Sequence, residues 1–209
     1  MSEEEAVIVQ VAGGPALEAR LGAVSPARGG FVLCHPHPLY GGDMDNPVVI
    51  RAAEVCRQVG HATLRFNFRG VGASAGRHDK GEGEQEDIRA AVAALAARLP
   101  AGSAIGVIGY SFGAWTAARA MRPGQAPLGL IAPPLGMFDF DRLGPDGGRL
   151  LLVAGTRDPY CPVEALHRLA QATGGDERTV EGADHFFFGK LFPLGEAIGA
   201  WLAGAAPAR

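Results

Sequence analysis

The sequence predicts an α/β fold in which a mostly parallel central sheet carries helices on both faces and follows an antiparallel hairpin. Short apolar strands alternate with helical segments along most of the chain, and this order requires parallel strands joined by helical crossovers. The run Leu150-Leu151-Leu152-Val153 is apolar throughout, as expected for a strand covered on both sides. Gly13-Gly14-Pro15 separates the first two β-rich runs and indicates a hairpin turn. The 209 residues are expected to form one domain, residues 1–209.

Each element follows from a local pattern. Asn46 followed by Pro47 is typical of a helix start, because the amide caps the first turn and proline suits the first helical position. Acidic residues open the helix that begins at Glu84, and Arg98 lies near its end, which matches the helix dipole. The sequence predicts strands at 6–12, 17–24, 31–34, 62–68, 104–110, 128–132, 149–154 and 177–180, and helices at 46–60, 84–99, 112–121, 162–173 and 191–202.

Composition excludes several classes of protein. Hydrophobic residues make up 47% and charged residues 20% of the chain, which is too apolar for disorder. The net charge is −3 without a basic stripe, so a nucleic-acid partner is not expected. No apolar run approaches the ~20 residues of a membrane helix, and the acidic start is unlike a secretory signal. We therefore expect a cytoplasmic protein whose Cys34, Cys56 and Cys161 are buried or incidental free thiols.

Gly109-Tyr110-Ser111-Phe112-Gly113 matches the G-x-S-x-G pattern of a nucleophilic serine. The pattern needs a strand before it and a helix after it, and the sequence predicts both. The flanking glycines have a steric role, since side chains two positions before and after the serine would collide in so tight a turn. Ser111 is the expected nucleophile, and the start of the helix favours the negative charge that develops during its attack.

A serine hydroxyl needs a base that removes its proton and an acid that orients the base. Two histidines follow Ser111: His167 lies inside a predicted helix, whereas His185 lies in the loop after the last strand, where a base of this kind belongs. His185 is therefore the expected base. Asp158, in the loop after the strand that ends at Ala154, is the expected acid, although the same aspartate suits a cap for the following helix.

Other aspartates are weaker candidates for the acid. Asp184 is adjacent to His185, and sequence neighbours rarely face each other well enough for such a bond. Asp139 and Asp141 follow the preceding strand less directly, and of these two Asp139 is kept as the fallback.

Acyl transfer also needs backbone N–H donors for the oxyanion. One is expected from Phe112, directly after the nucleophile. The other is expected from the loop 35–42, where Pro36 and Pro38 have no N–H and His37, Leu39 or Tyr40 must donate instead. His37 is favoured and Tyr40 is next.

The same loop admits a metal-dependent alternative. His35-x-His37 is a spacing found in metallohydrolases, and Asp43 or Asp45 would complete such a site. The hairpin and the serine motif both argue against this alternative, and His35 is expected to be a buried hydrogen-bonding residue.

Four segments together resemble small bacterial α/β-hydrolases, in particular the branches similar to dienelactone hydrolases and acyl-peptidases. The segments are His35-Pro36-His37-Pro38-Leu39-Tyr40-Gly41-Gly42-Asp43-Met44-Asp45-Asn46, Phe66-Asn67-Phe68-Arg69-Gly70-Val71-Gly72-Ala73-Ser74-Ala75-Gly76, Gly109-Tyr110-Ser111-Phe112-Gly113 and Gly182-Ala183-Asp184-His185-Phe186-Phe187. The resemblance implies an α/β-hydrolase fold with Ser111, Asp158 and His185 as the catalytic triad. It leaves the substrate open, because members act on esters, thioesters, lactones and peptides. Dienelactone hydrolases proper use cysteine as the nucleophile, so Ser111 departs from that branch.

The interval from Pro133 to Gly148 is short and rich in Gly, Pro and Asp, so little or no lid is expected over the site. Such an open site suits a small or short-acyl ester, cleaved through an acyl-enzyme without a cofactor. A non-catalytic binding module, a thioesterase or peptidase, and a metal-dependent hydrolase are the alternatives. The polar loop from Arg69 to Asp87 has two interpretations, substrate contact or turn and helix-cap formation. The side chains expected to wall the pocket are Tyr40, Met137, Phe138 and Phe186.

Overall fold

The computed structural model describes residues 4–122, 124–145 and 149–204 of the chain. Over these residues the strands form one eight-stranded sheet in the order β1-β2-β4-β3-β5-β6-β7-β8. The strands are β1 (Glu5–Gln10), β2 (Ala16–Gly22), β3 (Gly30–Cys34), β4 (Ala62–Phe66), β5 (Ile105–Tyr110), β6 (Leu128–Ile131), β7 (Leu150–Gly155) and β8 (Asp176–Val180). The helices are a short 3₁₀ turn η1 (Pro38–Tyr40), α1 (Pro47–Gln58), α2 (Gly83–Ala96), α3 (Phe112–Ala120), α4 (Val163–Thr173) and α5 (Leu191–Leu202).

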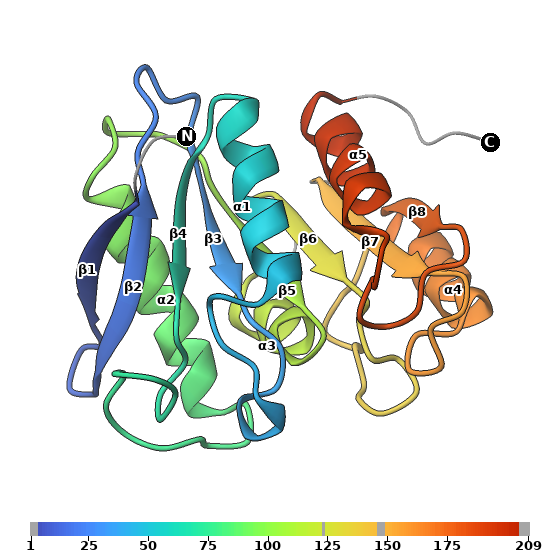
Figure 1. Ribbon diagram of the computed structural model, residues 1–209, viewed down its shortest axis with the longest axis horizontal. Helices are drawn as coiled ribbons and strands as arrows, with labels where there is room; N and C mark the ends of the chain where they lie inside the picture. The colour runs from blue at the N-terminus through green and yellow to red at the C-terminus, as the bar shows by residue number, and fades with distance from the viewer. Residues whose placement is uncertain (1–3, 123, 146–148, 205–209) are drawn as a thin grey trace.

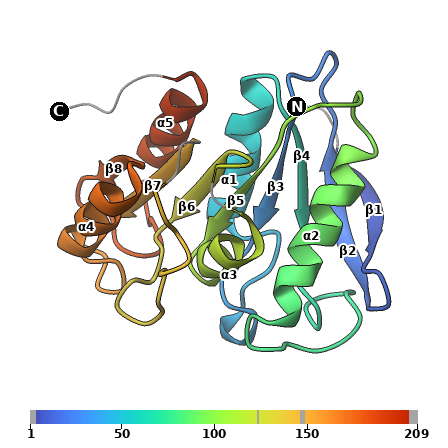
Figure 2. The same cartoon turned by 180° about the vertical axis from the view of Figure 1, so that it is seen from behind.

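The predicted fold class is confirmed. β1 and β2 form an antiparallel hairpin, β2 pairs antiparallel with β4, and β3 to β8 are otherwise parallel. Helices α1 and α5 cover one face of the sheet in Figure 1, and α2, α3 and α4 cover the other face in Figure 2. All loops at the carboxyl ends of the parallel strands therefore meet at one edge, the lower edge in Figure 1.

Alternating side chains of the central strands fill two separate cores. Phe31 and Leu33 of β3 pack in the core with α1 and α5, while Val32 and Cys34 pack in the core with α2, α3 and α4. Successive side chains of a strand point to opposite faces, so a strand buried on both sides is apolar at every position. All three cysteines are free and buried within these two cores, as the sequence predicts.

The predicted ends of the elements agree with the structure to within three residues, and the predicted bounds 191–202 coincide with α5. Strand β4 ends at Phe66 rather than at 68, because the Phe68 N–H donates to the Nε2 atom of His35 at 3.0 Å instead of to a neighbouring strand. Asn46 caps α1 as predicted, since its side-chain oxygen accepts the Val48 N–H at 3.0 Å. The 3₁₀ turn at 38–40 was not predicted.

Between β6 and β7 the described residues 132–145 and 149 contain turns and no helix. Part of the interval expected to lack a lid, residues 146–148, lies outside the described residues. None of the described helices has the length and apolarity needed to cross a membrane.

Candidate active site

The turn between β5 and α3 holds Ser111 in a strained conformation. Its φ of 54° and ψ of −116° lie in a region that non-glycine residues avoid, at a cost of about 1–3 kcal/mol. The flanking glycines make the turn possible: a Cβ at Gly113 would lie 2.4 Å from the carbonyl oxygen of Cys34, and one at Gly109 would lie 2.2 Å from that of Gly113. The steric reason for both glycines is therefore visible in the structure.

Ser111, His185 and Asp158 lie in one chain of hydrogen bonds. Ser111 Oγ is 2.9 Å from Nε2 of His185, and Nδ1 of His185 is 2.7 Å from Oδ2 of Asp158. Asp158 and His185 are buried, while Ser111 is half-buried and reachable from solvent. With the Nδ1 proton donated to the carboxylate, Nε2 is free to accept the proton of the serine hydroxyl.

Asp158 also organises the loop that carries it. Its Oδ1 atom accepts the N–H groups of Tyr160 and Cys161, at 2.8 and 3.0 Å. The following helix begins only at Val163 with Pro162 as its cap, so Asp158 does not cap that helix, although the sequence allowed this role. One oxygen therefore shapes the loop and the other faces the imidazole.

The loop of His185 is fastened to its neighbours by three bonds. The buried Tyr110 hydroxyl donates to the backbone carbonyl of His185 at 2.9 Å. The Gly182 N–H donates to Thr156 Oγ1 at 2.8 Å, and the Arg157 N–H to the carbonyl of Ala183 at 2.9 Å. Sequence reasoning missed Tyr110 because its partner is 75 positions away, and no local pattern signals such a contact.

The remaining acids and the second histidine have other roles. Asp184 Oδ1 accepts the Phe186 N–H at 3.0 Å, and the Asp139 carbonyl accepts the Trp115 indole N–H at 3.1 Å. His167 is exposed on α4 and lies 2.8 Å from Glu177. Within the described part of the chain, none of these three residues forms a hydrogen bond with Ser111.

Only His37, of the three candidates in the loop after β3, keeps an uncommitted N–H among the described residues. The Leu39 N–H donates to the His37 ring at 3.2 Å, and the Tyr40 N–H donates to the His37 carbonyl at 3.1 Å. Phe112, the first residue of α3, likewise has an N–H without a partner in the described chain. Both donors therefore have the freedom that an oxyanion hole requires.

The His-x-His pair is engaged by the protein itself. His35 is fully buried, its Nδ1 atom lies 2.6 Å from the Pro36 carbonyl, and its Nε2 accepts the Phe68 N–H. Burial lowers the pKa of His35 to about 4, which keeps the ring neutral at pH 7. Within the described residues no group of three potential metal ligands comes together.

The polar loop 69–87 packs against the loop 35–42, which is here called the oxyanion loop. The fully buried Glu84 accepts the N–H groups of Asp79 and Gly81, at 2.8 and 2.9 Å, and its Oε1 lies 2.7 Å from Nδ1 of His78. The His78 ring packs against the rings of His37 and Phe112, with centroids 5.0 and 5.5 Å apart. The polar groups of this loop form turns and the start of α2, which is one of its two interpretations, and substrate contact stays a prediction. Sequence reasoning missed His78.

The residues expected to wall the pocket divide into two groups. Phe186 is exposed and its ring centroid lies 5.6 Å from that of His185, and exposed Tyr40 packs on the His37 ring at 4.7 Å. Phe138 instead stacks on Trp115 at 4.4 Å and joins the core, and exposed Met137 has no ring or hydrogen-bond contact with Ser111 or His185. Tyr160, which sequence reasoning missed, packs edge-on against His185 at 4.9 Å.

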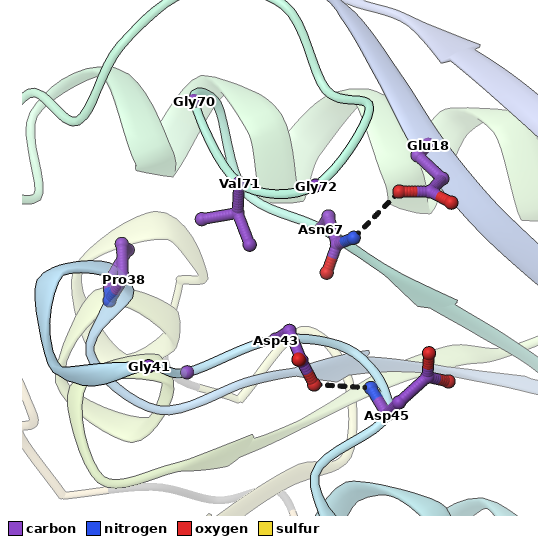
Figure 3. Close-up of a pocket in the computed structure, with 10 residues that line it drawn as sticks. Glu18, Pro38, Gly41, Asp43, Asp45, Asn67, Gly70, Val71 and Gly72 are labelled. Atoms are coloured by element: carbon purple, nitrogen blue, oxygen red, sulfur yellow. Dashed lines mark hydrogen bonds between the residues drawn. The ribbon is translucent and has the colours of Figure 1, made fainter.

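A separate hollow of about 450 Å³ lies beside the oxyanion loop (Figure 3). Neither Ser111 nor His185 lines it. The side chains of Glu18 and Asn67 meet across its wall at 2.8 Å, and Asp43 accepts the Asp45 N–H at 2.9 Å. Its walls are Glu18, Pro38, Gly41, Gly42, Asp43, Asp45, Asn67, Gly70, Val71 and Gly72.

Known proteins match both the sequence and the fold. An uncharacterized protein of Rickettsia prowazekii (strain Madrid E) is 34% identical over 192 residues, covering 86% of this chain and 81% of its own length. An α/β serine hydrolase homologue of Coxiella burnetii superposes with a TM-score of 0.86 at 33% identity, over 95% of this chain and 97% of the other. A Xanthomonas campestris α/β serine hydrolase described as having no lid gives a TM-score of 0.86 at 32% identity, over 100% and 98%.

Residues 32–173, more than half of the chain, match the family described as X-Pro dipeptidyl-peptidase (S15 family). This stretch begins within β3 and includes the loop with His37, the turn of Ser111 and the loop of Asp158. The chain therefore belongs to the S15 family and is a small hydrolase of the α/β-hydrolase superfamily.

Proposed function

We propose that this protein is a serine hydrolase that cleaves an ester-type bond of a small or short-acyl substrate without a cofactor. The observation that carries the proposal is the hydrogen-bonded chain from Ser111 through His185 to Asp158, with distances of 2.9 and 2.7 Å. A strained serine at the start of a helix, next to an imidazole oriented by a carboxylate, is the arrangement that nucleophilic acyl transfer needs.

The proposed reaction has two steps. Ser111 Oγ attacks the ester carbonyl carbon while His185 Nε2 takes the hydroxyl proton, and the N–H groups of His37 and Phe112 stabilise the oxyanion. The tetrahedral intermediate then releases the alcohol, which receives the proton from His185, and an acyl-enzyme remains. Water attacks this ester with the same histidine as base, releases the acid and restores Ser111. Asp158 stays ionised throughout and orients the ring.

A fluorophosphonate probe, which phosphonylates an activated serine, tests this proposal. We expect one probe molecule per chain on the wild type and none on Ser111→Ala, with loss of p-nitrophenyl acetate hydrolysis in the same variant. EDTA treatment of the wild type is expected to change neither result. An unlabelled wild type would favour the non-catalytic binding module, and metal-dependent turnover by Ser111→Ala would favour the metallohydrolase.

A peptidase activity is the second candidate, because the matched family is described as an X-Pro dipeptidyl-peptidase. The same three residues would serve, since an amide also needs a nucleophile and a protonated leaving group. Comparing Ala-Pro-p-nitroanilide with p-nitrophenyl acetate separates the two activities. We expect turnover of the ester alone, and efficient release of nitroaniline would assign the peptidase instead.

We also propose a cytoplasmic location and a small-molecule substrate, with no nucleic-acid or membrane partner. The three buried free cysteines support a reducing compartment, because nothing in the fold depends on their oxidation.

A further inference from the structure

Three exposed aromatic side chains form a ledge beside His185. Tyr160 and Phe186 both pack edge-on against the His185 ring, at centroid distances of 4.9 and 5.6 Å. Phe188 continues the row, 5.7 Å from Phe186. The exposed fractions are 42% for Tyr160, 54% for Phe186 and 77% for Phe188, although His185 between them is buried. Contiguous exposed apolar surface of this kind marks a binding site.

The loop that carries the two exposed phenylalanines has a strained backbone. Phe187, between them, has a φ of 54°, which a bulky side chain rarely adopts, and its ring is fully buried in the core with α1 and α5. Burial of the Phe187 ring stabilises the loop, whereas the exposed rings of Phe186 and Phe188 add no such stability. A binding role for Phe186 and Phe188 accounts for the arrangement, because strain of this type persists where function requires it.

The chemistry of His185 decides which part of a substrate lies on the ledge. As the tetrahedral intermediate collapses, the bond between the carbonyl carbon and the leaving oxygen breaks, and the proton that His185 took from Ser111 passes from Nε2 to that oxygen. The leaving oxygen must therefore come within hydrogen-bond distance of Nε2. The group attached to this oxygen then lies next to the two rings that flank His185.

We infer that Tyr160, Phe186 and Phe188 form a subsite for the leaving group, and that the preferred substrates are esters of alcohols that carry an aromatic ring. This inference rests on the proposed serine-hydrolase function and adds the chemical class of the alcohol. Aromatic rings pack on one another edge-on or offset, so the ledge selects a ring by contact as well as by apolar area.

Two isomeric esters test the position of the ring. 2-Phenylethyl acetate carries it on the alcohol, and ethyl phenylacetate carries it on the acid, so the two have the same atoms and similar hydrophobicity. After division by the rates of hydroxide-catalysed hydrolysis, we expect the wild-type kcat/KM to favour 2-phenylethyl acetate by about tenfold. Phe186→Ala and Tyr160→Ala are expected to bring this ratio close to one.

Phe192→Ala is the matched control. Phe192 is also an exposed phenylalanine, at 69%, but its ring contacts Arg51 on α1 and not the His185 ring. We expect this variant to keep both kcat/KM values of the wild type. An unchanged wild-type ratio in Phe186→Ala and Tyr160→Ala, or a wild-type preference for ethyl phenylacetate, would overturn the subsite.

Fluorophosphonate labelling of Ser111 distinguishes this failure from that of the proposed function. Labelled protein that hydrolyses both esters without preference refutes only the leaving-group subsite. Unlabelled protein that hydrolyses neither ester refutes the hydrolase and the subsite together. A change of oligomeric state in Phe186→Ala with an unchanged ester ratio would assign the ledge to contact between copies of the chain and so refute the subsite.

Discussion

Asp158 is the residue whose two oxygens have separate tasks, and a single substitution tests them. In Asp158→Asn the amide still accepts the N–H groups of Tyr160 and Cys161 if its oxygen replaces Oδ1. The amide nitrogen then faces Nδ1 of His185 and favours the tautomer whose Nε2 carries the proton, which cannot accept another from Ser111. We expect kcat to fall about 10³–10⁴-fold with little change in KM.

The fallback acid supplies the control for that measurement. Asp139 is exposed and contacts Trp115 through its carbonyl only, so Asp139→Asn is expected to retain wild-type kcat and KM. If Asp139→Asn lost activity while Asp158→Asn kept it, the assignment of the acid would be reversed.

His35 is expected to make the stability of the protein pH-dependent. Burial lowers its native pKa to about 4, whereas in the unfolded chain it titrates near 6.5. Between these values the unfolded state binds a proton that the native state does not, so the free energy of unfolding falls as the pH drops from about 6.5 to about 4, by up to about 3 kcal/mol. Above pH 6.5 this residue contributes no pH dependence.

Urea unfolding of the wild type and His35→Gln across this pH range checks the sign and the source. The glutamine amide does not titrate, so the variant, although less stable at pH 7, is expected to show a shallower loss of stability on acidification. Burial also lowers the pKa values of His37 and His61, so a residual slope is expected. Parallel curves for the two proteins would exclude His35 as the source.

At the scale of elements, the start of α2 depends on one buried carboxylate. The fully buried Glu84 carboxylate accepts two loop N–H groups and faces the partly buried His78. Glu84→Ala leaves these groups without partners, and we expect a loss of about 3 kcal/mol in the free energy of unfolding. The loop that carries His78 would then no longer support His37 and Phe112, so kcat should fall as well.

Glu82, two residues earlier, is a matched control in the same turn. Its side chain is exposed and pairs with Arg119 on the surface. Glu82→Ala is expected to leave urea unfolding and kcat nearly unchanged, because exposed ion pairs contribute little. Equal destabilisation by both substitutions would show that the buried network at Glu84 has no special importance.

The elements that sequence reasoning predicted correctly have local causes. Asn46 caps α1 with its own side chain, and the glycines around Ser111 are required by a turn of five residues. What it missed depends on contacts between distant segments. The Tyr110 hydroxyl reaches His185 across 75 positions, and Tyr160 reaches the same ring only after β7 and β8 have paired.

The oxyanion loop was predicted in part from the sequence. The prolines at 36 and 38 reduced the possible donors to three residues from sequence alone. Choosing His37 required the 3₁₀ turn at 38–40, because that turn engages the N–H groups of Leu39 and Tyr40. A single 3₁₀ turn has no clear sequence pattern of its own, and Pro36 and Pro38 are equally compatible with other loop conformations.

At the scale of the whole molecule, the edge of the sheet that carries Ser111 is not covered by a helical lid in the described residues. The chain returns from β6 to β7 through turns, and a relative that shares 32% of its residues is described as having no lid. An enzyme whose lid shields an apolar site gains activity when a lipid interface opens it. A site without a lid has no closed conformation that an interface could open. It also excludes water poorly around long acyl chains.

The rate of ester hydrolysis, measured below and above the solubility limit of the substrate, therefore tests whether a lid covers Ser111. With p-nitrophenyl butyrate we expect the rate to rise hyperbolically with dissolved substrate and to level off when emulsion forms, without a further increase. Activity should also decline from butyrate to palmitate esters, because the exposed site gains little from a longer chain. A steep rise in the rate when emulsion forms, together with a preference for the palmitate ester, would contradict this expectation. It would mean that a segment covers Ser111 in solution and opens at the interface between lipid and water.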